Sequence, residues 1–331
     1  MGIPYKLQHP RTGIAAVGSA LVDMCLLEDD AFLVSTGACK GGMTLSDAAS
    51  IQKILQKSGK VPTVVPGGSA CNTILGIGKL GGNARFIGKR GEDDLGVLFE
   101  AGLKTHNVHP LLFKSVSPTG HVLSIITPDA QRSMFTYLGA SAEAHPTEMT
   151  NDLFENTALV HIEGYLLFNE NLMMSVLKAA KSSGALISLD LASFTVVEAA
   201  RSLIEDICAE YVDIVIANED EAKAFTGFSD ESKALESLAQ KAPMAVLKVG
   251  KRGSFVAHNG SRIAVTSMGN GDAIDTTGAG DLWAAGFLYG LVHGFSLEKS
   301  GQLGSACGYE VCQVVGASIP EDGWKRIKKL I

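Results

Sequence analysis

The chain has 331 residues, of which 46% are hydrophobic and 19% are charged. This composition provides a large apolar core and excludes an extensively disordered protein. A formal net charge of −7 argues against a nucleic-acid partner, and we interpret the short basic stretch KRIKK (residues 325–329) as a solvated helix face.

The cysteine spacing and the apolar runs bear on the compartment in which the protein works. The six cysteines form no CxxC pair, so we predict reduced core thiols and no protein-ligated zinc. The first residues contain no apolar segment typical of a signal peptide, and no uninterrupted apolar run reaches membrane-spanning length. We therefore expect a soluble cytoplasmic protein without a membrane partner.

Short β-rich runs alternate with helical runs along the chain. The strand candidates are rich in Val, Ile, Leu and Ala and comprise residues 14–18, 63–67, 84–88, 159–164, 185–190, 214–218 and 244–250. The helix candidates between them are residues 45–57, 171–183 and 231–241. Strands that are apolar throughout are typical of a sheet covered on both faces. The alternation therefore predicts an α/β protein with a mostly parallel central sheet flanked by helices.

Two segments depart from this alternation. Residues 21–34 and 121–139 have the pattern of antiparallel ribbons, the second with a turn at Pro128 and Asp129. They predict a small β-rich lid over one edge of the main domain. We place the α/β core in residues 1–18, 41–113 and 140–331, and a discontinuous lid in residues 19–40 and 114–139.

The stretch GIGKLG (residues 76–81) matches the GxGxxG pattern of dinucleotide-binding proteins. That fingerprint requires a strand before the first glycine and a helix after the last. Here a helix-like run precedes it, and a turn and a strand follow it. We therefore predict a glycine-rich helix that ends in a turn at Gly81 and Gly82, which argues against a dinucleotide oxidoreductase.

A second glycine-rich stretch, DTTGAGD (residues 275–281), precedes an apolar run that we expect to form a buried helix. Gly278, Ala279 and Gly280 at a helix start would leave backbone N–H groups free to bind an anion. Asp281 beside such a site could take a proton from a hydroxyl while a phosphoryl group is transferred. Asp281 could equally be a first-turn acid that only stabilises the helix.

DTTGAGD closely resembles the C-terminal signature of the ribokinase/phosphofructokinase-B (PfkB) family of sugar and nucleoside kinases. PGGSACNTILGIGKLGGNARFIGKRGEDDLG (residues 66–96) resembles that family's N-terminal signature. Three further stretches resemble its substrate-binding strand end, its NxxE motif and its nucleotide-binding turn: GSALVD (18–23), NEDE (218–221) and LKVGKRGS (247–254). The resemblance spans nearly the whole chain and implies a three-layer ribokinase-like fold with a small β lid.

The resemblance implies catalytic roles for five positions. Asp281 would be the general base for the acceptor hydroxyl, and Gly278, Ala279 and Gly280 would form the anion hole. Arg132 resembles a lid arginine that could reach the transferring phosphate, although as an exposed turn residue it could have no such role.

The resemblance also implies a set of substrate-binding residues. Asp23, Gly67, Gly68 and Asn72 would hold the acceptor's hydroxyls. Carboxylate and amide groups exchange hydrogen bonds with vicinal hydroxyls, and paired glycines let a sugar approach the backbone. Without the resemblance, Asp23 could simply end a strand and Asn72 could cap a helix.

ATP and Mg²⁺ are the implied cofactors. The residues expected beside them are Asn218, Glu221, Lys248, Gly250, Gly253 and Ser305. Glu221 would hold the metal through water. As alternatives, Glu221 could be an ordinary first-turn acid and Lys248 could point into solvent.

These features predict an ATP-dependent kinase that phosphorylates a primary hydroxyl of a sugar or nucleoside. Our first choice is adenosine, because GSALVD, RSMFTYLGAS (132–141) and IEGYLL (162–167) are most similar to bacterial adenosine-kinase-like members. The lid residues Met134, Phe135, Tyr137 and Leu138 could form apolar walls for a purine, or could only pack the lid's strands.

The alternatives are a sugar kinase and a non-catalytic nucleotide-binding protein. Ribokinases usually carry GGKGANQA where this chain has GGSACNTI, which counts against ribose but leaves fructose, ketodeoxygluconate or another pentose derivative open. A non-catalytic descendant would be expected to lose the general base, and Asp281 is present. An exposed lid edge could also pair with a second copy of the chain.

Overall fold

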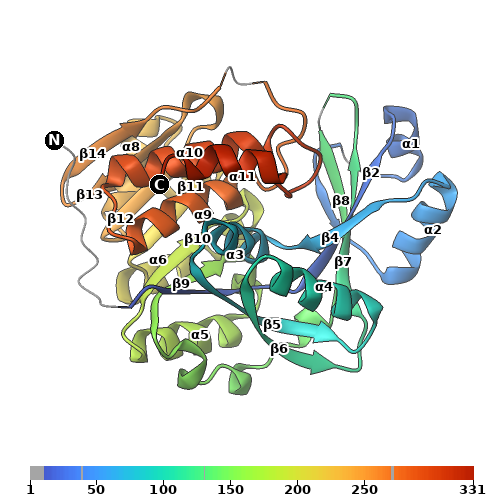
Figure 1. The fold of residues 1–331 in the computed structure, drawn as a ribbon, viewed down its shortest axis with the longest axis horizontal. Helices are drawn as coiled ribbons and strands as arrows, with labels where there is room; N and C mark the ends of the chain where they lie inside the picture. Colours follow the sequence, from blue (N-terminus) through green and yellow to red (C-terminus); the bar gives the residue numbers. More distant parts are fainter. Residues whose placement is uncertain (1–10, 39, 130, 270–271) are drawn as a thin grey trace.

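The computed structural model describes residues 11–38, 40–129, 131–269 and 272–331 (Figure 1). In these residues nine strands form one sheet in the order β14-β13-β12-β11-β10-β9-β1-β5-β6. Their bounds are β1 (Gly13–Val17), β5 (Asn83–Gly91), β6 (Val108–Ser115), β9 (Thr157–Glu163), β10 (Leu186–Asp190), β11 (Ile214–Asn218), β12 (Met244–Lys248), β13 (Ser254–His258) and β14 (Ser261–Val265). The seven strands from β12 to β6 are parallel, and β13 and β14 add an antiparallel hairpin at one edge.

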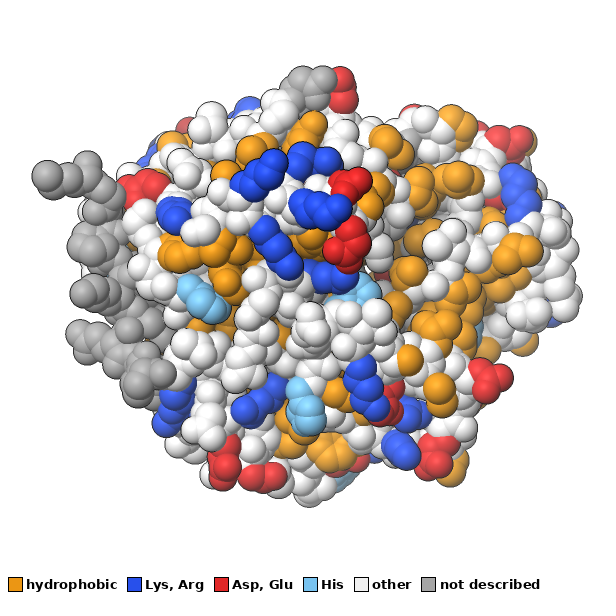
Figure 2. All heavy atoms as spheres, in the orientation of Figure 1, with side chains coloured by type: hydrophobic (Ala, Val, Ile, Leu, Met, Phe, Trp, Pro, Cys, Tyr) orange, Lys and Arg blue, Asp and Glu red, His pale blue; other side chains and the backbone are white. Residues whose placement is uncertain are grey.

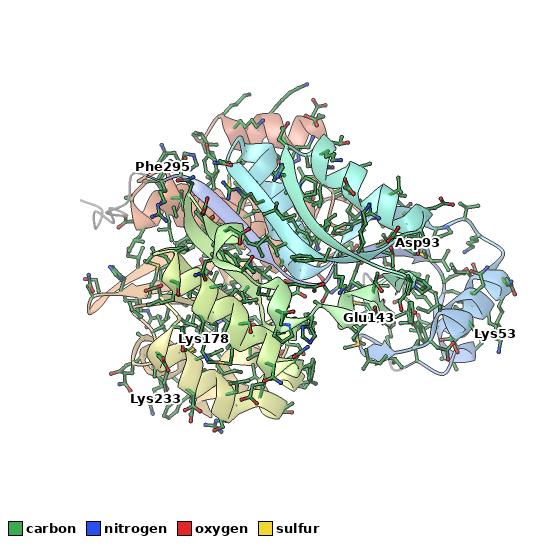
Figure 3. The ribbon with its side chains drawn as sticks, turned by 90° about the horizontal axis from the view of Figure 1, so that it is seen from below. Lys53, Asp93, Glu143, Lys178, Lys233 and Phe295 are labelled. Carbon is green, nitrogen blue, oxygen red and sulfur yellow. The ribbon has the colours of Figure 1, made fainter. Side chains whose placement is uncertain are left out.

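Helices cover both faces of this sheet. One face carries α3 (Ser69–Leu80), α4 (Asp94–Thr105), α9 (Ala279–Val292), α10 (Leu297–Val311) and α11 (Glu321–Lys328), and the other carries α5 (Glu170–Ser182), α6 (Phe194–Glu210), α7 (Glu219–Thr226) and α8 (Glu231–Ala239). In Figure 3, Lys178 of α5 and Lys233 of α8 mark one helical layer, and Phe295 lies on the opposite side of the molecule. The predicted three-layer α/β architecture is confirmed.

The sheet is buried on both faces because its strands alternate between two apolar clusters. In β1, Ile14 and Ala16 pack among the residues of α3 and α9, whereas Ala15 and Val17 pack among those of α5 and α6. Such two-sided burial explains why the central strands β1, β11 and β12 are apolar almost throughout.

The helix that follows DTTGAGD is buried almost all round, as predicted. Its glycines allow α10 to lie against it: a Cβ on Gly286 would be 2.6 Å from the Leu303 carbonyl oxygen, and one on Gly290 would be 2.6 Å from Ser300 Oγ. This close packing holds the second half of α9 against α10.

GIGKLG lies inside α3, which ends at the left-handed C-cap Gly81 with φ of 96°. The predicted glycine-rich helix is confirmed, and the stretch has the wrong structural context for a dinucleotide fingerprint.

Five other strands form a second sheet at the end of the molecule that carries Lys53 and Asp93 in Figure 3. Their order is β3-β8-β7-β2-β4, with bounds β2 (Leu21–Leu27), β3 (Met43–Leu45), β4 (Thr63–Gly67), β7 (Thr119–Ile126) and β8 (Arg132–Gly139). β7 and β8 pair antiparallel, which confirms the ribbon predicted for residues 121–139. We call this sheet the lid.

The lid differs from the sequence prediction in two ways. Residues 21–34 form β2 and then the helix α1 (Asp30–Ser35), because Asp29 caps that helix by accepting a hydrogen bond from the Phe32 N–H at 2.7 Å. Residues 63–67, predicted as a core strand, form β4 at the lid's edge, paired antiparallel with β2. A proline in that strand, Pro66, is compatible with an edge position, where one N–H needs no partner.

The lid therefore takes β3 and β4 from segments that we had assigned to the core. Its outer face packs on α1 and α2 (Ala48–Ser58) through a separate cluster that includes Leu26, Leu33 and Ile51. Residues 1–10 of the predicted core, together with Cys39, lie outside the described residues.

The basic stretch near the C-terminus lies on the surface of the molecule. On the face in Figure 2, Lys and Arg side chains gather over α10 and α11 with acids beside them. Lys325 and Arg326 are exposed and pair with Asp322 and Glu310 at 2.8 and 2.6 Å, so KRIKK contributes to a solvated helix face as predicted. Among the described residues, no helix is both long and apolar enough to cross a bilayer.

Candidate active site

One cavity of about 950 Å³ lies where the lid meets the large sheet. Because β1, β9, β10, β11 and β12 are parallel, their carboxyl ends open at the same edge, and the N-termini of α3 and α9 point to that edge too. Ligands of open α/β sheets bind at this edge. The polar lining residues include Ser19, Asp23, Ser69, Asn72, Arg132, Glu163, Asp190, Asn218, Glu221, Lys248 and Asp281.

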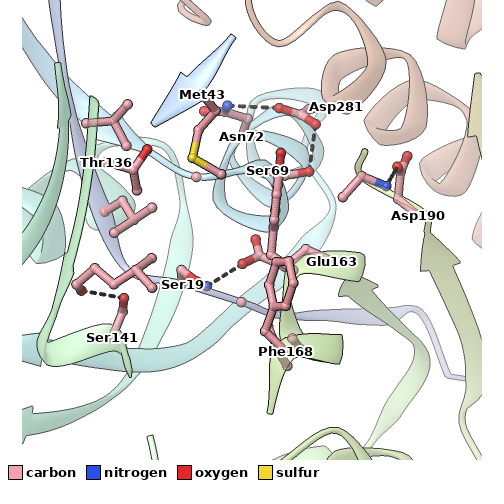
Figure 4. Close-up of a pocket in the computed structure, with 18 of the residues that line it drawn as sticks. Ser19, Met43, Ser69, Asn72, Thr136, Ser141, Glu163, Phe168, Asp190 and Asp281 are labelled. Atoms are coloured by element: carbon pink, nitrogen blue, oxygen red, sulfur yellow. Dashed lines mark hydrogen bonds between the residues drawn. The ribbon is translucent and has the colours of Figure 1, made fainter. Parts of the chain in front are cut away.

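Asp281 lies in the first turn of α9, facing α3 (Figure 4). Ser69 Oγ donates a hydrogen bond to one carboxylate oxygen at 2.8 Å, and Asn72 Nδ2 donates to the other at 2.9 Å. Withdrawal from water raises the pKa of Asp281, and these two hydrogen bonds partly oppose that effect. Both oxygens keep a lone pair, so this carboxylate can still accept a proton.

The start of α9 is open to an anion. Gly278 adopts φ of 73°, and no side chain caps the helix, so the first turn keeps N–H groups that no intrahelical carbonyl satisfies. Of the predicted anion-hole residues, Ala279 already donates its N–H to the Thr276 carbonyl at 3.2 Å. Gly278 and Gly280 remain the better matches to the predicted role.

The predicted acceptor residues come together at the lid's base. A Cβ on Gly67 would lie 2.2 to 2.4 Å from the carboxylate atoms of Asp23, so Gly67 makes room for that side chain. Gly68 has φ of 94°, and a Cβ on it would lie 2.7 Å from the Ser19 carbonyl oxygen. The amide of Asn72, predicted to bind the acceptor, is directed to Asp281 instead.

Asp23 is buried, and this burial raises its pKa to about 6, with Arg132 lowering it and Asp281 raising it. Arg132 is half-buried and lines the cavity, rather than lying fully exposed at a turn. The two groups therefore face the same space from β2 and β8, two lid strands that are separated by β7.

The alternating faces of the lid divide its apolar residues. Met134, Thr136 and Leu138 of β8 line the cavity, whereas Phe135 and Tyr137 pack with the outer cluster of the lid. Only two of the four predicted purine-wall residues thus reach the site. Tyr165 and Phe168, on the 3₁₀ helix η4 (Gly164–Phe168), line the opposite wall.

Glu163, to which sequence reasoning gave no role, ends β9 inside the cavity. Its carboxylate accepts hydrogen bonds from the Ser19 N–H at 2.8 Å and the Ala70 N–H at 3.0 Å, and burial raises its pKa. It thereby joins the loop after β1 to the N-terminus of α3. The sequence signal that could have revealed Glu163 is an acid at the end of the predicted strand LVHI.

Asn218 and Glu221 form a capping box at the start of α7. The Asn218 side chain accepts from the Glu221 N–H at 2.9 Å, and the Glu221 carboxylate accepts from the Asn218 N–H at 2.8 Å. Glu221 is therefore a first-turn acid, and it also lines the cavity. Burial, followed by the charge of Asp190, raises the pKa of Glu221 to about 7.

Lys248 points into the cavity and not into solvent. Its ammonium donates to Asp190 Oδ2 at 2.8 Å. Asp190, which ends β10, was also missed in the sequence. Burial alone would raise the pKa of Asp190, but Lys248 holds it below its ordinary value.

Three predicted ATP residues lie apart from the cavity lining. Gly250 and Gly253 form the turn between β12 and β13 with φ of 54° and 102°, and Ser305 is buried in α10. Their contacts with ATP stay predictions.

The raised pKa of Asp23 gives a prediction for stability. The folded chain holds this proton more tightly than the unfolded chain, so ionisation of Asp23 lowers the free energy of unfolding as the pH rises from 3.8 through about 6. We expect Asp23→Asn to gain stability over the wild type by about 2 kcal/mol more at pH 7.5 than at pH 4.5. Urea denaturation of both chains at the two pH values measures this difference. If the stability gained by Asp23→Asn stayed constant or fell as the pH rose, the pKa of Asp23 would not be raised in the folded chain.

Comparisons with known proteins give the family of the chain. The pfkB family carbohydrate kinase profile matches residues 30–323. A probable sugar kinase from Rhizobium etli CFN 42 is 31% identical, with a TM-score of 0.90, over 97% of this chain and 99% of that one. Adenosine kinase from Sinorhizobium meliloti is 31% identical, with a TM-score of 0.89, over 97% of this chain and 100% of that one.

A plant protein is also similar to this chain. Probable fructokinase-6, chloroplastic, from Arabidopsis thaliana is 28% identical over 95% of this chain and 85% of its own length. The signatures at both ends, the shared fold and the profile match together show that the chain belongs to the pfkB family of carbohydrate kinases, phosphotransferases that act on a hydroxyl group.

Proposed function

We propose that this kinase transfers the γ-phosphoryl group of ATP to the primary hydroxyl of a purine nucleoside, with adenosine as the first candidate. The observation that carries the proposal is the cavity that unites Asp281, Asp23 and the apolar inner face of the lid. Its volume of about 950 Å³ suits a nucleoside next to a nucleotide's phosphates. The similarity to the Sinorhizobium adenosine kinase supports this acceptor.

Each end of the cavity has its own role in the proposal. Asp23 and the backbone at Gly68 would hold the ribose hydroxyls, and Met134 and Leu138 would contact the base. Asp281, oriented by Ser69 and Asn72, would take the proton from the attacking hydroxyl as the N-terminus of α9 stabilises the phosphoryl group's charge. Closure of the lid would exclude water, which would otherwise compete as acceptor.

The donor set near Glu221 suits a magnesium ion held through water. Each oxygen of the Glu221 carboxylate accepts one hydrogen bond within the capping box and keeps a lone pair for a metal-bound water. Among the described residues, no three His, Cys, Asp or Glu side chains are grouped to hold a metal by themselves. Glu221 would hold the ion through water, and a magnesium ion there would supply positive charge near the donor's phosphates.

A sugar is the second candidate acceptor. The Rhizobium protein is named a probable sugar kinase and the Arabidopsis relative a fructokinase, and Asp23 would bind a sugar's hydroxyls as readily as a ribose. Pairing of the lid with a second copy and a cytoplasmic location stay predictions.

The acceptor is tested by ADP release with ATP and Mg²⁺ across adenosine, other nucleosides, ribose, fructose and ketodeoxygluconate. We expect the highest kcat/KM with adenosine. A higher value with a sugar would overturn the nucleoside assignment and keep the reaction class.

A further inference from the structure

Lys248 occupies the junction between the two halves of the cavity. It is the last residue of β12, and its side chain is 14% exposed and paired with an Asp190 side chain that is 6% exposed. Lys248 and Arg132 are the two Lys or Arg residues in the described cavity lining. Arg132 belongs to the lid, so Lys248 is the cation of this lining that the core sheet supplies.

Gly280 leaves room for the ammonium of Lys248. A Cβ on Gly280 would lie 3.0 Å from Lys248 Nζ, closer than ordinary side-chain packing allows. The ammonium therefore lies directly against the first turn of α9, where free backbone N–H groups can bind an anion. A group bound by that turn would be within reach of Lys248.

Two carboxylates, those of Asp190 and Glu221, act on the Lys248 ammonium, whereas a simple ion pair needs one. Burial alone would lower the pKa of Lys248, but the carboxylates of Asp190 and Glu221 outweigh it and hold that pKa above its ordinary value. Lys248 thus stays an ammonium. One of its three donors is directed to Asp190, which leaves two for an incoming ligand.

We propose that Lys248 is a catalytic residue whose ammonium contacts the phosphoryl group during its transfer, and that Asp190 is a positioning residue that holds this ammonium against the N-terminus of α9. The inference rests on the proposed function, because it takes ATP as the phosphoryl donor.

The role of Lys248 follows from the balance of the transfer step. The acceptor oxygen forms its bond to the γ-phosphorus, the bond from that phosphorus to the bridging oxygen breaks, and ADP leaves with the electron pair. Asp281 receives the hydroxyl proton. Lys248 neither gains nor loses a proton, and it donates hydrogen bonds to non-bridging oxygens, where charge-assisted bonds are strongest.

Nucleotide binding separates this role from a structural one without requiring a known acceptor. Isothermal titration calorimetry with Mg²⁺ would compare ADP with the non-hydrolysable analogue that has a β,γ-imido bridge. Lys248→Met is expected to reduce the preference for the analogue over ADP by about 10-fold or more, the value of a hydrogen bond to a charged group, with little change in ADP affinity. Lys178→Met is the matched control, because Lys178 is an exposed lysine on α5 that does not line the cavity.

Turnover with the best acceptor of the panel gives the second readout. We expect Lys248→Met to lower kcat by about 10²–10³-fold, the usual effect of losing one preorganised donor to a developing negative charge, with the acceptor's KM little changed. Lys248→Arg should restore part of the loss. Asp190→Asn should lower kcat less, and the double variant should be no slower than Lys248→Met, because Asp190 acts only through Lys248.

Three results would overturn the inference. Equal loss of affinity for ADP and for the analogue would place Lys248 on the phosphates of ADP. A lowered melting temperature with unchanged kcat would make the pair purely structural. A wild type that binds both nucleotides but does not use adenosine would remove the proposed acceptor alone, since the nucleotide preference still decides the role of Lys248. A wild type that binds neither nucleotide would overturn the ATP assignment and the inference with it.

Discussion

Asp281→Asn is expected to lower kcat by about 10²–10⁴-fold, the usual contribution of a positioned general base, while the Kd for the acceptor changes little. The asparagine keeps the size of the side chain but can no longer take the hydroxyl proton. Single-turnover transfer with saturating ATP and acceptor measures the chemical step, and calorimetry measures acceptor binding.

The matched control for that change is Asp230→Asn. Asp230 caps α8 by accepting from the Lys233 N–H at 2.9 Å, and asparagine caps helices equally well. This control should retain the wild-type kcat. If Asp281→Asn kept more than about a tenth of the wild-type kcat, the role of general base would have to pass to another group.

Gly67→Ala is expected to raise the acceptor's KM by about 10–100-fold, because hydrogen bonds to a charged group are worth about 1.5–3 kcal/mol. The added methyl group would lie 2.2 to 2.4 Å from the Asp23 carboxylate atoms, so Asp23 must leave its position at the cavity wall. Initial rates over a range of acceptor concentrations at saturating ATP measure this effect.

A double-mutant cycle is the control for Gly67. In an Asp23→Ala background the carboxylate is gone, so Gly67→Ala should cost far less. An equal loss in both backgrounds would show that Gly67 acts through the backbone of β4 and not by making room for Asp23.

Much of the core was predictable because its signals are local. Apolar runs such as residues 214–218 are typical of strands covered on both faces. DTTGAGD predicts a helix whose first N–H groups are uncapped, with Asp281 in its first turn. Local signals also explain why α3 was predicted correctly despite its GxGxxG pattern. The residues next to that pattern have the composition of a helix before it and of a turn and a strand after it.

The missed residues depend on pairing between distant segments. Glu163 and Asp190 are each a single acid at the end of an apolar strand, and only the register of β9 with β10 brings them side by side. The lid was predicted only in part, because β4 has the valine-rich pattern of a core strand and joins the lid through its pairing with β2. Likewise, alternation along β8 divides Met134 from Phe135, but it does not reveal which of the two faces the cavity.

The most direct test of transfer to a primary hydroxyl is the ³¹P NMR spectrum of the product formed from ATP, Mg²⁺ and adenosine. A phosphate ester of a primary alcohol carries two protons on the carbon next to the oxygen, so we expect a triplet in the proton-coupled spectrum. This triplet should grow as ADP appears, and about 10²–10⁴-fold more slowly with Asp281→Asn. A doublet would show phosphorylation of a secondary hydroxyl, and a singlet of inorganic phosphate alone would show transfer to water. Either result would contradict the proposed reaction.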